Sequence, residues 1–139
     1  RRLSARASAE HHPEDDGGPG AAATFELRRE RDVPVARLVG EVDLEGIAAL
    51  GGTLADAVTD RDRGLVIDLD GVEYLDSAGL HLLHDTARAL AARGQSLRVV
   101  VSADAGVARL LELVNLVRIL PVDATVDAAV DALEHRPPP

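Results

Sequence analysis

Two short apolar segments constrain the fold of this chain most strongly. Residues 65–67 are an uninterrupted apolar run, and residues 97–101 are apolar at all but one position. Runs of this length are typical of strands that are buried on both faces of a sheet. Each run is followed by apolar residues at intervals of three and four, over residues 80–91 and 107–114, which indicates a helix. Strands joined through helices pair in parallel, so the sequence predicts a parallel sheet.

The rest of the chain completes one α/β domain. Residues 24–30 alternate between apolar and polar side chains, and residues 34–40 form a second predicted strand after a short turn, which indicates an antiparallel hairpin. The remaining predicted elements are a helix over residues 47–58, a strand over 117–120 and a helix over 123–133 that Asp123 caps. We therefore predict a single α/β domain over residues 24–136, with a mixed, mostly parallel sheet of about five strands and four helices, in the order β-β-α-β-α-β-α-β-α.

Residues 1–23 are predicted to be a disordered tail. Segment 10–20 has no large apolar residue and ends in four consecutive turn-forming residues at 17–20. Such a segment buries too little surface to offset the entropy that ordering costs. The first ten residues also lack the apolar stretch of a signal peptide, and no apolar run in the chain reaches 18 residues. The expectation is a cytoplasmic protein without membrane insertion.

Composition excludes several classes of function. The chain has no cysteine, which excludes disulfides, a thiol nucleophile and cysteine-ligated metal sites. It has 15 basic against 24 acidic residues, a net charge of −9, and its only aromatic residues are Phe25 and Tyr74. Such a protein lacks the basic surface and the stacking platforms that nucleic-acid binding needs. An acidic chain of this kind is suited to binding a basic protein surface.

Two turns at the carboxyl edge of the predicted sheet are candidates for a functional site. Ligands of open α/β sheets usually bind at that edge. The turns span residues 40–44 and 75–80, and parallel strands can place Asp43 of the first turn beside Ser77 of the second. These two residues are therefore the first candidates for a site.

Ser77 has a structural and a functional interpretation. Asp76 or Ser77 could simply cap the helix that follows, because either side chain can accept a hydrogen bond from an amide of the first turn. The functional interpretation rests on the surroundings, since small residues follow Ser77 and residues 64–87 contain five acids and no arginine. An exposed serine in such surroundings responds strongly to an added phosphate.

Catalysis and metal binding are weaker interpretations of the same region. His81 lies one helical turn after Ser77 and could contact it, but a nucleophile elbow needs glycine where this chain has Leu75. No third residue is evident that would orient the histidine. His81 and His84, with Asp85, could face a metal, although solvated helix residues are the commoner case. The sequence therefore predicts no catalytic residue, no cofactor and no metal, and a small serine hydrolase is a remote alternative.

Three motifs resemble those of STAS domains. They are Gly-Glu-Val-Asp-Leu at residues 40–44, Leu-Val-Ile-Asp-Leu-Asp-Gly-Val at 65–72 and Leu-Asp-Ser-Ala-Gly-Leu at 75–80. The stretch at residues 107–113 and the final helix also fit this family. The resemblance covers residues 24–134 and is closest to the stand-alone bacterial anti-sigma factor antagonists.

The resemblance implies a partner switch without enzyme activity. In that family the unmodified protein binds an anti-sigma factor, which then releases its sigma factor for transcription. The anti-sigma factor is often a serine kinase that phosphorylates the serine of the motif, here Ser77, and thereby ends binding until a phosphatase restores it. By the same resemblance, Asp43 is the acidic position beside that serine. The docking face is expected to comprise Asp43, Leu44, Asp76, Ala78, Gly79, Leu80 and His81.

Another class of function stays open beside the partner switch. STAS domains also serve as scaffold subunits of transport systems and of multi-subunit stress-sensing complexes. A neighbouring transporter gene would favour the scaffold, whereas a neighbouring gene for a kinase-type anti-sigma factor would favour the switch.

Overall fold

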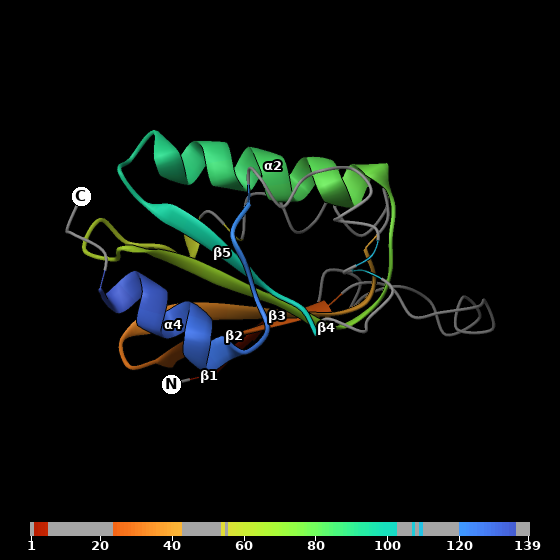
Figure 1. Cartoon of the computed structure of the whole chain (residues 1–139), viewed down its shortest axis with the longest axis horizontal. Coiled ribbons are helices and arrows are strands. Elements are labelled where there is room, and N and C mark those ends of the chain that lie inside the picture. Colours follow the sequence, from red (N-terminus) through yellow and green to blue (C-terminus); the bar gives the residue numbers. More distant parts are fainter. Residues whose placement is uncertain are drawn as a thin grey trace.

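The structure, a computed structural model, describes residues 2–5, 24–42, 54, 56–102, 107, 109 and 120–135. These residues form a six-stranded sheet with one continuous helix on each face (Figure 1). The strands are β1 (Arg2–Ala5), β2 (Thr24–Glu30), β3 (Val33–Val42), β4 (Gly64–Leu75), β5 (Ser96–Val100) and β6 (Val122–Asp123). The helices are α2 (Ser77–Ala91) and α4 (Val126–Glu134).

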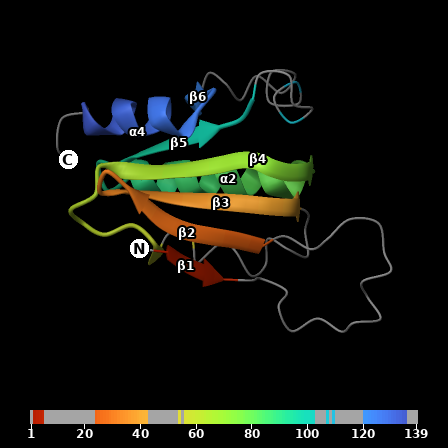
Figure 2. The same cartoon turned by 90° about the horizontal axis from the view of Figure 1, so that it is seen from below.

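The sheet is mixed, as predicted. Its strands lie in chain order from β1 to β6, which Figure 2 shows face-on. β1, β2 and β3 are antiparallel neighbours, whereas β3, β4, β5 and β6 pair in parallel. β3 and β4 end in register, with Val42 opposite Leu75. Both carboxyl ends therefore lie at one edge of the sheet, and α2 begins at that edge.

The apolar core occupies both faces of the central strand β4. Leu65 and Ile67 pack in the cluster on the α2 side, whereas Val66 packs in the cluster on the α4 side. All three side chains are fully buried, which confirms the prediction that residues 65–67 form a strand buried on both faces. Leu75, the last residue of β4, packs in the cluster on the α2 side, so core contacts hold the carboxyl end of β4 where α2 begins.

The described residues contain two continuous helices, against four predicted. α2 matches the helix predicted over residues 80–91, and the chain turns away at Gly94, whose φ of 76° suits glycine. The helices predicted over 47–58 and 107–114 fall largely outside the described residues. Of their described residues, 57 and 58 are not helical, whereas the helical ones are 54, 56, 107 and 109. Neither α2 nor α4 is long and apolar enough to cross a bilayer.

β1 corrects the prediction that all of residues 1–23 form a disordered tail. Residues 2–5 pair with β2 in antiparallel register, with Leu3 opposite Leu27. Such pairing uses the backbone N–H and C=O groups of an edge strand, so it does not need the large apolar residues on which the prediction relied. The described sheet therefore has β1 in addition to the five strands expected, and residues 6–23 lie outside the described part of the chain.

The last strand and helix differ from their predicted positions. Of the strand predicted over residues 117–120, only the last residue is described, and it lies before β6 rather than in a strand. Asp123, which was expected to cap the last helix, accepts hydrogen bonds from Arg98 at 2.7 and 3.0 Å instead. Thr125 caps α4. The side chain of Asp123 thus links β6 to β5 through its ion pair with Arg98.

Candidate functional site

The candidate site lies where β4 passes into α2. Leu75, the last residue of β4, is anchored in the core. Asp76 stays extended, with φ −104° and ψ −171°, and Ser77 is the first residue of the helix. α2 then packs on the sheet through the buried side chains of Leu82, Leu83 and Leu90. Core contacts on both sides of the junction therefore fix the position of Ser77.

Asp76 caps α2. Its carboxylate oxygen Oδ1 accepts a hydrogen bond from the backbone N–H of Gly79 at 3.1 Å. Its carbonyl oxygen accepts from the backbone N–H of Leu80 at 3.0 Å. Asp76 and Ser77 were alternative caps at the level of sequence, and the structure shows that Asp76 has this role. The hydroxyl of Ser77 is therefore not needed to begin the helix.

The side chain of Ser77 is exposed at the start of α2. Within the described part of the chain its hydroxyl makes no hydrogen bond, including to His81. A nucleophilic serine needs a base within hydrogen-bond reach. An exposed hydroxyl that no base contacts among the described residues fits a modification site better than a catalytic nucleophile.

The other docking residues predicted in the first turns of α2 differ in their exposure. His81 is exposed, Ala78 and Leu80 are half-buried, and Gly79 is buried. Leu80 also packs against the core cluster beneath α2. Gly79 offers a partner little surface, and its backbone N–H serves the helix cap instead. The accessible part of this face therefore consists of Ser77 and His81, flanked by Ala78 and Leu80.

Of the other predicted turn, residues 40–44, the structure describes only the part up to Val42, where β3 ends. Asp43 and Leu44 lie outside the described residues. β3 ends one residue earlier, at Val42, whose backbone is in register with Leu75. The two strands therefore deliver the chain to the same edge of the sheet at the same level. That Asp43 acts beside the start of α2 stays a prediction.

The histidines of α2 do not gather into a metal site. His84 Nδ1 lies 3.9 Å from Asp85 Oδ1, and His81 is exposed on its own. Across the described ranges, no group of three or more histidine, aspartate or glutamate side chains is close enough to hold a metal ion. The structure therefore presents His81 and His84 as surface residues of the helix.

Removal of the Asp76 side chain is expected to weaken α2 moderately. Asp76→Ala loses the oxygen that accepts from Gly79, which costs about 1 kcal/mol of the free energy of unfolding. Asp76→Asn keeps an equivalent oxygen and should stay within about 0.5 kcal/mol of the parent protein. Urea unfolding followed by circular dichroism measures both changes. Equal stability of Asp76→Ala and the parent would show that this cap does not hold the start of α2.

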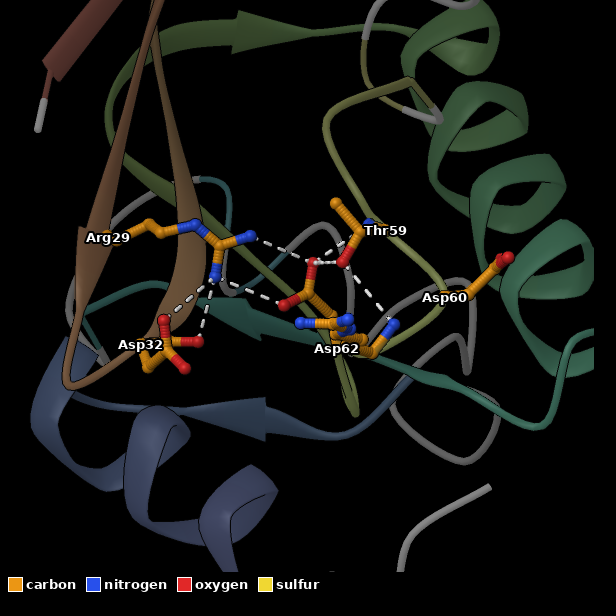
Figure 3. Close-up of a pocket in the computed structure, with 6 residues that line it drawn as sticks. Arg29, Asp32, Thr59, Asp60 and Asp62 are labelled. Atoms are coloured by element: carbon orange, nitrogen blue, oxygen red, sulfur yellow. Dashed lines mark hydrogen bonds and ion pairs between the residues drawn. The ribbon is translucent and has the colours of Figure 1, made fainter.

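A second polar cluster lies at the opposite edge of the sheet, between the β2–β3 hairpin and the start of β4 (Figure 3). It surrounds an open cavity of about 510 Å³, lined by Arg29, Asp32, Thr59, Asp60, Arg61 and Asp62. None of these residues belongs to the site predicted from sequence. Their sequence pattern, a mixture of acids and arginines at the end of β2 and in turns, carries no signal that distinguishes them from ordinary surface positions.

The charges in this cluster are largely paired with one another. Arg29 donates two hydrogen bonds to the carboxylate of Asp62, at 3.1 and 3.0 Å, and one to the carbonyl oxygen of Asp32 at 2.9 Å. Asp62 also accepts from the backbone N–H and the hydroxyl of Thr59, at 2.8 and 3.1 Å. These bonds tie the β2–β3 hairpin to the segment that leads into β4. We therefore interpret the cluster as structural.

The same contacts hold the pKa of Asp62 below its ordinary value. Burial acts to raise the pKa of this carboxyl group, but the hydrogen bonds from Arg29 and Thr59 and the charge of Arg29 more than offset burial. The hydrogen bond to Asp62 in turn raises the pKa of Arg29, which stays protonated throughout. A carboxyl group with a lowered pKa stabilises the folded state above its unfolded-state pKa, and this contribution is lost as the pH falls through the folded-state pKa.

Acid is therefore expected to remove the contribution of Asp62 to stability. The loss should begin as the pH falls below the unfolded-state pKa of about 4. Asp62→Asn cannot titrate, so its stability should fall less between pH 5 and about pH 2.5, although at pH 7 it is lower by about 1–3 kcal/mol because Arg29 loses its charged partner. Thermal unfolding of both proteins over this range measures the difference. Parallel pH profiles would contradict the assignment.

Sequence comparison finds one matching domain family and curated relatives. Residues 25–121 match the family described as Mlab, STAS domain. Over 77 residues the chain is 40% identical to the anti-sigma-F factor antagonist RsfB of Mycobacterium tuberculosis, in strains CDC 1551 and H37Rv. The alignment covers 55% of this chain and 61% of RsfB, so the chain spans about three fifths of the length of the curated relative that it matches.

Solved structures resemble this one over most of its length. An anti-sigma factor antagonist from Mycobacterium paratuberculosis is 31% identical, with a TM-score of 0.72, over 81% of this chain and 95% of that chain. The anti-sigma factor antagonist SpoIIAA in its unphosphorylated form is 20% identical, with a TM-score of 0.64, over 81% of this chain and 98% of that chain, which is a likeness of fold. The family match over residues 25–121 includes the β4–α2 junction and Ser77.

Proposed function

The chain belongs to the STAS domain family of anti-sigma factor antagonists, and on that premise we propose that it binds an anti-sigma factor through the start of α2 and that phosphorylation of Ser77 ends this binding. The anti-sigma factor acts as the serine kinase, and a phosphatase returns the protein to its binding form. The protein thereby controls the release of a sigma factor, and so transcription, in the cytoplasm. It has no enzyme activity of its own in this proposal.

The exposed hydroxyl of Ser77 is the observation that carries the proposal. Asp76 supplies the helix cap, so the fold does not depend on the Ser77 hydroxyl. A kinase can therefore reach the hydroxyl without unfolding the helix. Backbone amides and the positive end of the helix dipole at this point tolerate a phosphate. Modification can therefore change the surface while leaving the domain folded.

The docking face in this proposal extends over both turns at the carboxyl edge of β3 and β4. Asp76, Ala78, Leu80 and His81 surround Ser77 along the start of α2, with Gly79 beneath them. Asp43 and Leu44 continue the face from the end of β3, whose register with β4 supports their placement at the same edge. In this role Asp43 assists phosphorylation or docking rather than folding.

Two other functions predict different behaviour of the same surface. A scaffold subunit of a transport or stress-sensing complex would bind its partners whether or not Ser77 is modified. A serine hydrolase would need His81 or another base at the Ser77 hydroxyl, and no such hydrogen bond exists within the described residues. The response of binding to phosphorylation therefore distinguishes the proposal from both.

The test uses the full chain and each purified anti-sigma factor of the serine-kinase class from the same organism. Calorimetric titration is expected to find one that binds, and incubation with ATP should place a single phosphate on Ser77, located by mass spectrometry. Ser77→Ala should bind without accepting phosphate. Ser102→Ala is the matched control, because Ser102 is a half-exposed serine whose hydroxyl already donates to Asp70 at 3.1 Å.

Two results would contradict the proposal. One is an absence of binding to every anti-sigma factor of this class. The other is phosphorylation that Ser77→Ala leaves unchanged, or a phosphorylated protein that binds as tightly as the unmodified one. The latter outcome would favour the scaffold function.

A further inference from the structure

Tyr74 is an exposed aromatic residue beside the candidate site. Its exposed fraction is 51%, and among the described residues the only other exposed large hydrophobic side chain is Val39, at 37%. The second aromatic residue of the chain, Phe25, is buried in the core. Tyrosine is enriched among the residues that contribute most to protein–protein binding, because it offers a large and rigid contact area.

The irregular carboxyl half of β4 is what turns Tyr74 outward. Core residues recur there at Leu69, Val72 and Leu75, three positions apart instead of two. The pairing of β3 with β4 shifts register twice over the same stretch, as β-bulges do. Tyr74 lies between two of these core residues and off the core face. Val72 and Leu75, on either side of Tyr74 in this segment, are buried in the core and fix the position of its backbone.

Glycine at position 71 permits this irregular segment. A β-carbon on Gly71 would lie 3.0 Å from Cγ2 of Val39 and 3.1 Å from the carbonyl oxygen of Leu38. Both distances are shorter than ordinary packing contacts. A β-carbon at position 71 would require these neighbours to move by a few tenths of an ångström, so glycine suits the close approach of β3 to β4 at this point.

Tyr74 is also close to Ser77 along the chain. Three residues of extended chain span about 10 Å, so the two side chains start within that distance of each other. β4 ends immediately before α2 begins, at one end of the molecule (Figure 1). Tyr74 lies off the face of β4 that packs on α2, but both it and Ser77 lie at the carboxyl end of β4, so one partner surface at this edge can contact both.

Charge indicates the kind of surface that fits here. Residues 64–87 carry five acids and no arginine or lysine. Of these acids, Asp70 and Asp85 are exposed and Asp76 is half-buried at the helix start, and a nearby basic group is the guanidinium of Arg37 on β3, which reaches Gly71. A partner with basic side chains around an apolar pocket complements an exposed tyrosine in an acidic field.

We propose that Tyr74 anchors the complex by inserting into an apolar pocket of the anti-sigma factor that arginine or lysine side chains surround. This inference rests on the proposed function and adds to the docking face a residue of β4 outside the first turn of α2. Binding buries the Tyr74 ring and leaves the fold unchanged, because the ring contributes little to the core in the free protein.

The chain itself supplies a probe for this contact. Tyr74 is its only tyrosine, and it has no tryptophan. Growth with 3-fluorotyrosine therefore gives a protein with a single fluorine signal, at Tyr74. Titration with the anti-sigma factor that binds in the preceding test should shift and broaden this signal to saturation at the calorimetric stoichiometry. A signal that stays unchanged while calorimetry records binding would overturn the inference and leave the proposed function intact.

Variants measure the strength of the contact. Tyr74→Ala should weaken binding at least tenfold, whereas Tyr74→Phe should stay within about threefold because it keeps the ring. Val39→Ala, which truncates the other exposed side chain, is the matched control and should also stay within about threefold. Thermal unfolding of each variant verifies the fold. Unchanged affinity of folded Tyr74→Ala would exclude the anchor, whereas a parent protein that binds no anti-sigma factor would contradict the proposed function itself.

Salt tests the chemistry of the partner surface. Opposite charges across an interface are screened by ions, so affinity should fall as the salt concentration rises from about 50 to about 500 mM. The affinity of Tyr74→Ala should fall by the same factor over this range, because the variant keeps every acid. An affinity that does not depend on salt would contradict the basic surround of the pocket.

Discussion

Ile67→Ala is expected to lower the free energy of unfolding by about 2–5 kcal/mol. Ile67 lies in the middle of β4 and has no exposed surface. Its backbone pairs with Ala36 of β3 and Val99 of β5, and both of these residues are fully buried as well. A smaller side chain leaves a cavity there, since strands that are tied into ladders on both sides cannot close over it.

Chemical denaturation with urea measures this loss directly. Val39→Ala is a suitable control, because Val39 lies in the neighbouring strand with 37% of its surface exposed and its truncation should cost about 1 kcal/mol or less. A cost for Ile67→Ala well below 2 kcal/mol would place residue 67 outside the tightly packed centre of the sheet. The parent and the variant should show the same slope of free energy against urea concentration, since the surface that unfolding exposes is almost unchanged.

The sequence predicted best those parts of the fold that strong apolar patterns determine. The buried run at residues 65–67 and the period of α2 over 80–91 both describe faces that must be hidden from water. The sequence did not predict β1, because an edge strand pairs through its backbone and needs no apolar pattern. The role of Asp123 was also mispredicted, because a carboxylate can cap a helix or pair with an arginine, and only the fold decides which.

Close approach between strands is another feature that sequence patterns do not reveal. A β-carbon on Gly64 would lie 2.0 Å from the carbonyl oxygen of Ser96, its partner in the β4–β5 ladder. This position therefore requires glycine, although from the sequence alone Gly64 is indistinguishable from an ordinary turn residue before a strand. The constraint arises between two segments that are about thirty residues apart, so no local pattern carries it.

The candidate site was predictable to the extent that its chemistry is local. The sequence left open whether Asp76 or Ser77 caps α2, and the structure assigns the cap to Asp76 with the Ser77 side chain exposed. The burial of Gly79 was not predicted, since it depends on how α2 packs on the sheet. The exposure of Tyr74 was missed for a related reason. Register shifts interrupt the alternation of β4, and apolar alternation is the signal from which a strand's exposed face is inferred.

Phosphorylation of Ser77 is expected to weaken binding to the anti-sigma factor by more than tenfold. The phosphate adds about −1.5 to −2 charges at pH 7. Where a partner carboxylate faces Ser77, apart from the basic side chains proposed around Tyr74, two such charges about 5 Å from it would repel it by about 1.7 kcal/mol in a water-like dielectric and by about 6.6 kcal/mol at an effective dielectric constant near 20. Each 1.4 kcal/mol corresponds to about a tenfold change in affinity. Steric exclusion over the small residues Ala78 and Gly79 adds to the repulsion.

The domain itself should survive the modification. The cap of α2 comes from Asp76, and the exposed Ser77 side chain lies outside the core, so a phosphate displaces no buried group. Amides at the start of a helix also favour negative charge. The thermal unfolding midpoint of the phosphorylated protein should therefore stay within a few degrees of that of the parent, and the loss should appear in binding alone.

Variants separate the charge of the phosphate from its size. Ser77→Glu carries one added charge, so about half of the repulsion remains, and the loss of affinity should lie between about fourfold and a few hundredfold. Ser77→Gln has nearly the same shape as Ser77→Glu but no charge. It should therefore lose less affinity than Ser77→Glu, and the difference between the two variants measures the electrostatic repulsion. Ser77→Ala should bind as the unmodified protein does and resist the kinase. Calorimetric titration of the four proteins against the anti-sigma factor ranks their affinities. Equal affinities for the parent, Ser77→Ala and Ser77→Glu would refute the switch and leave Ser77 as an exposed residue beside the Asp76 cap.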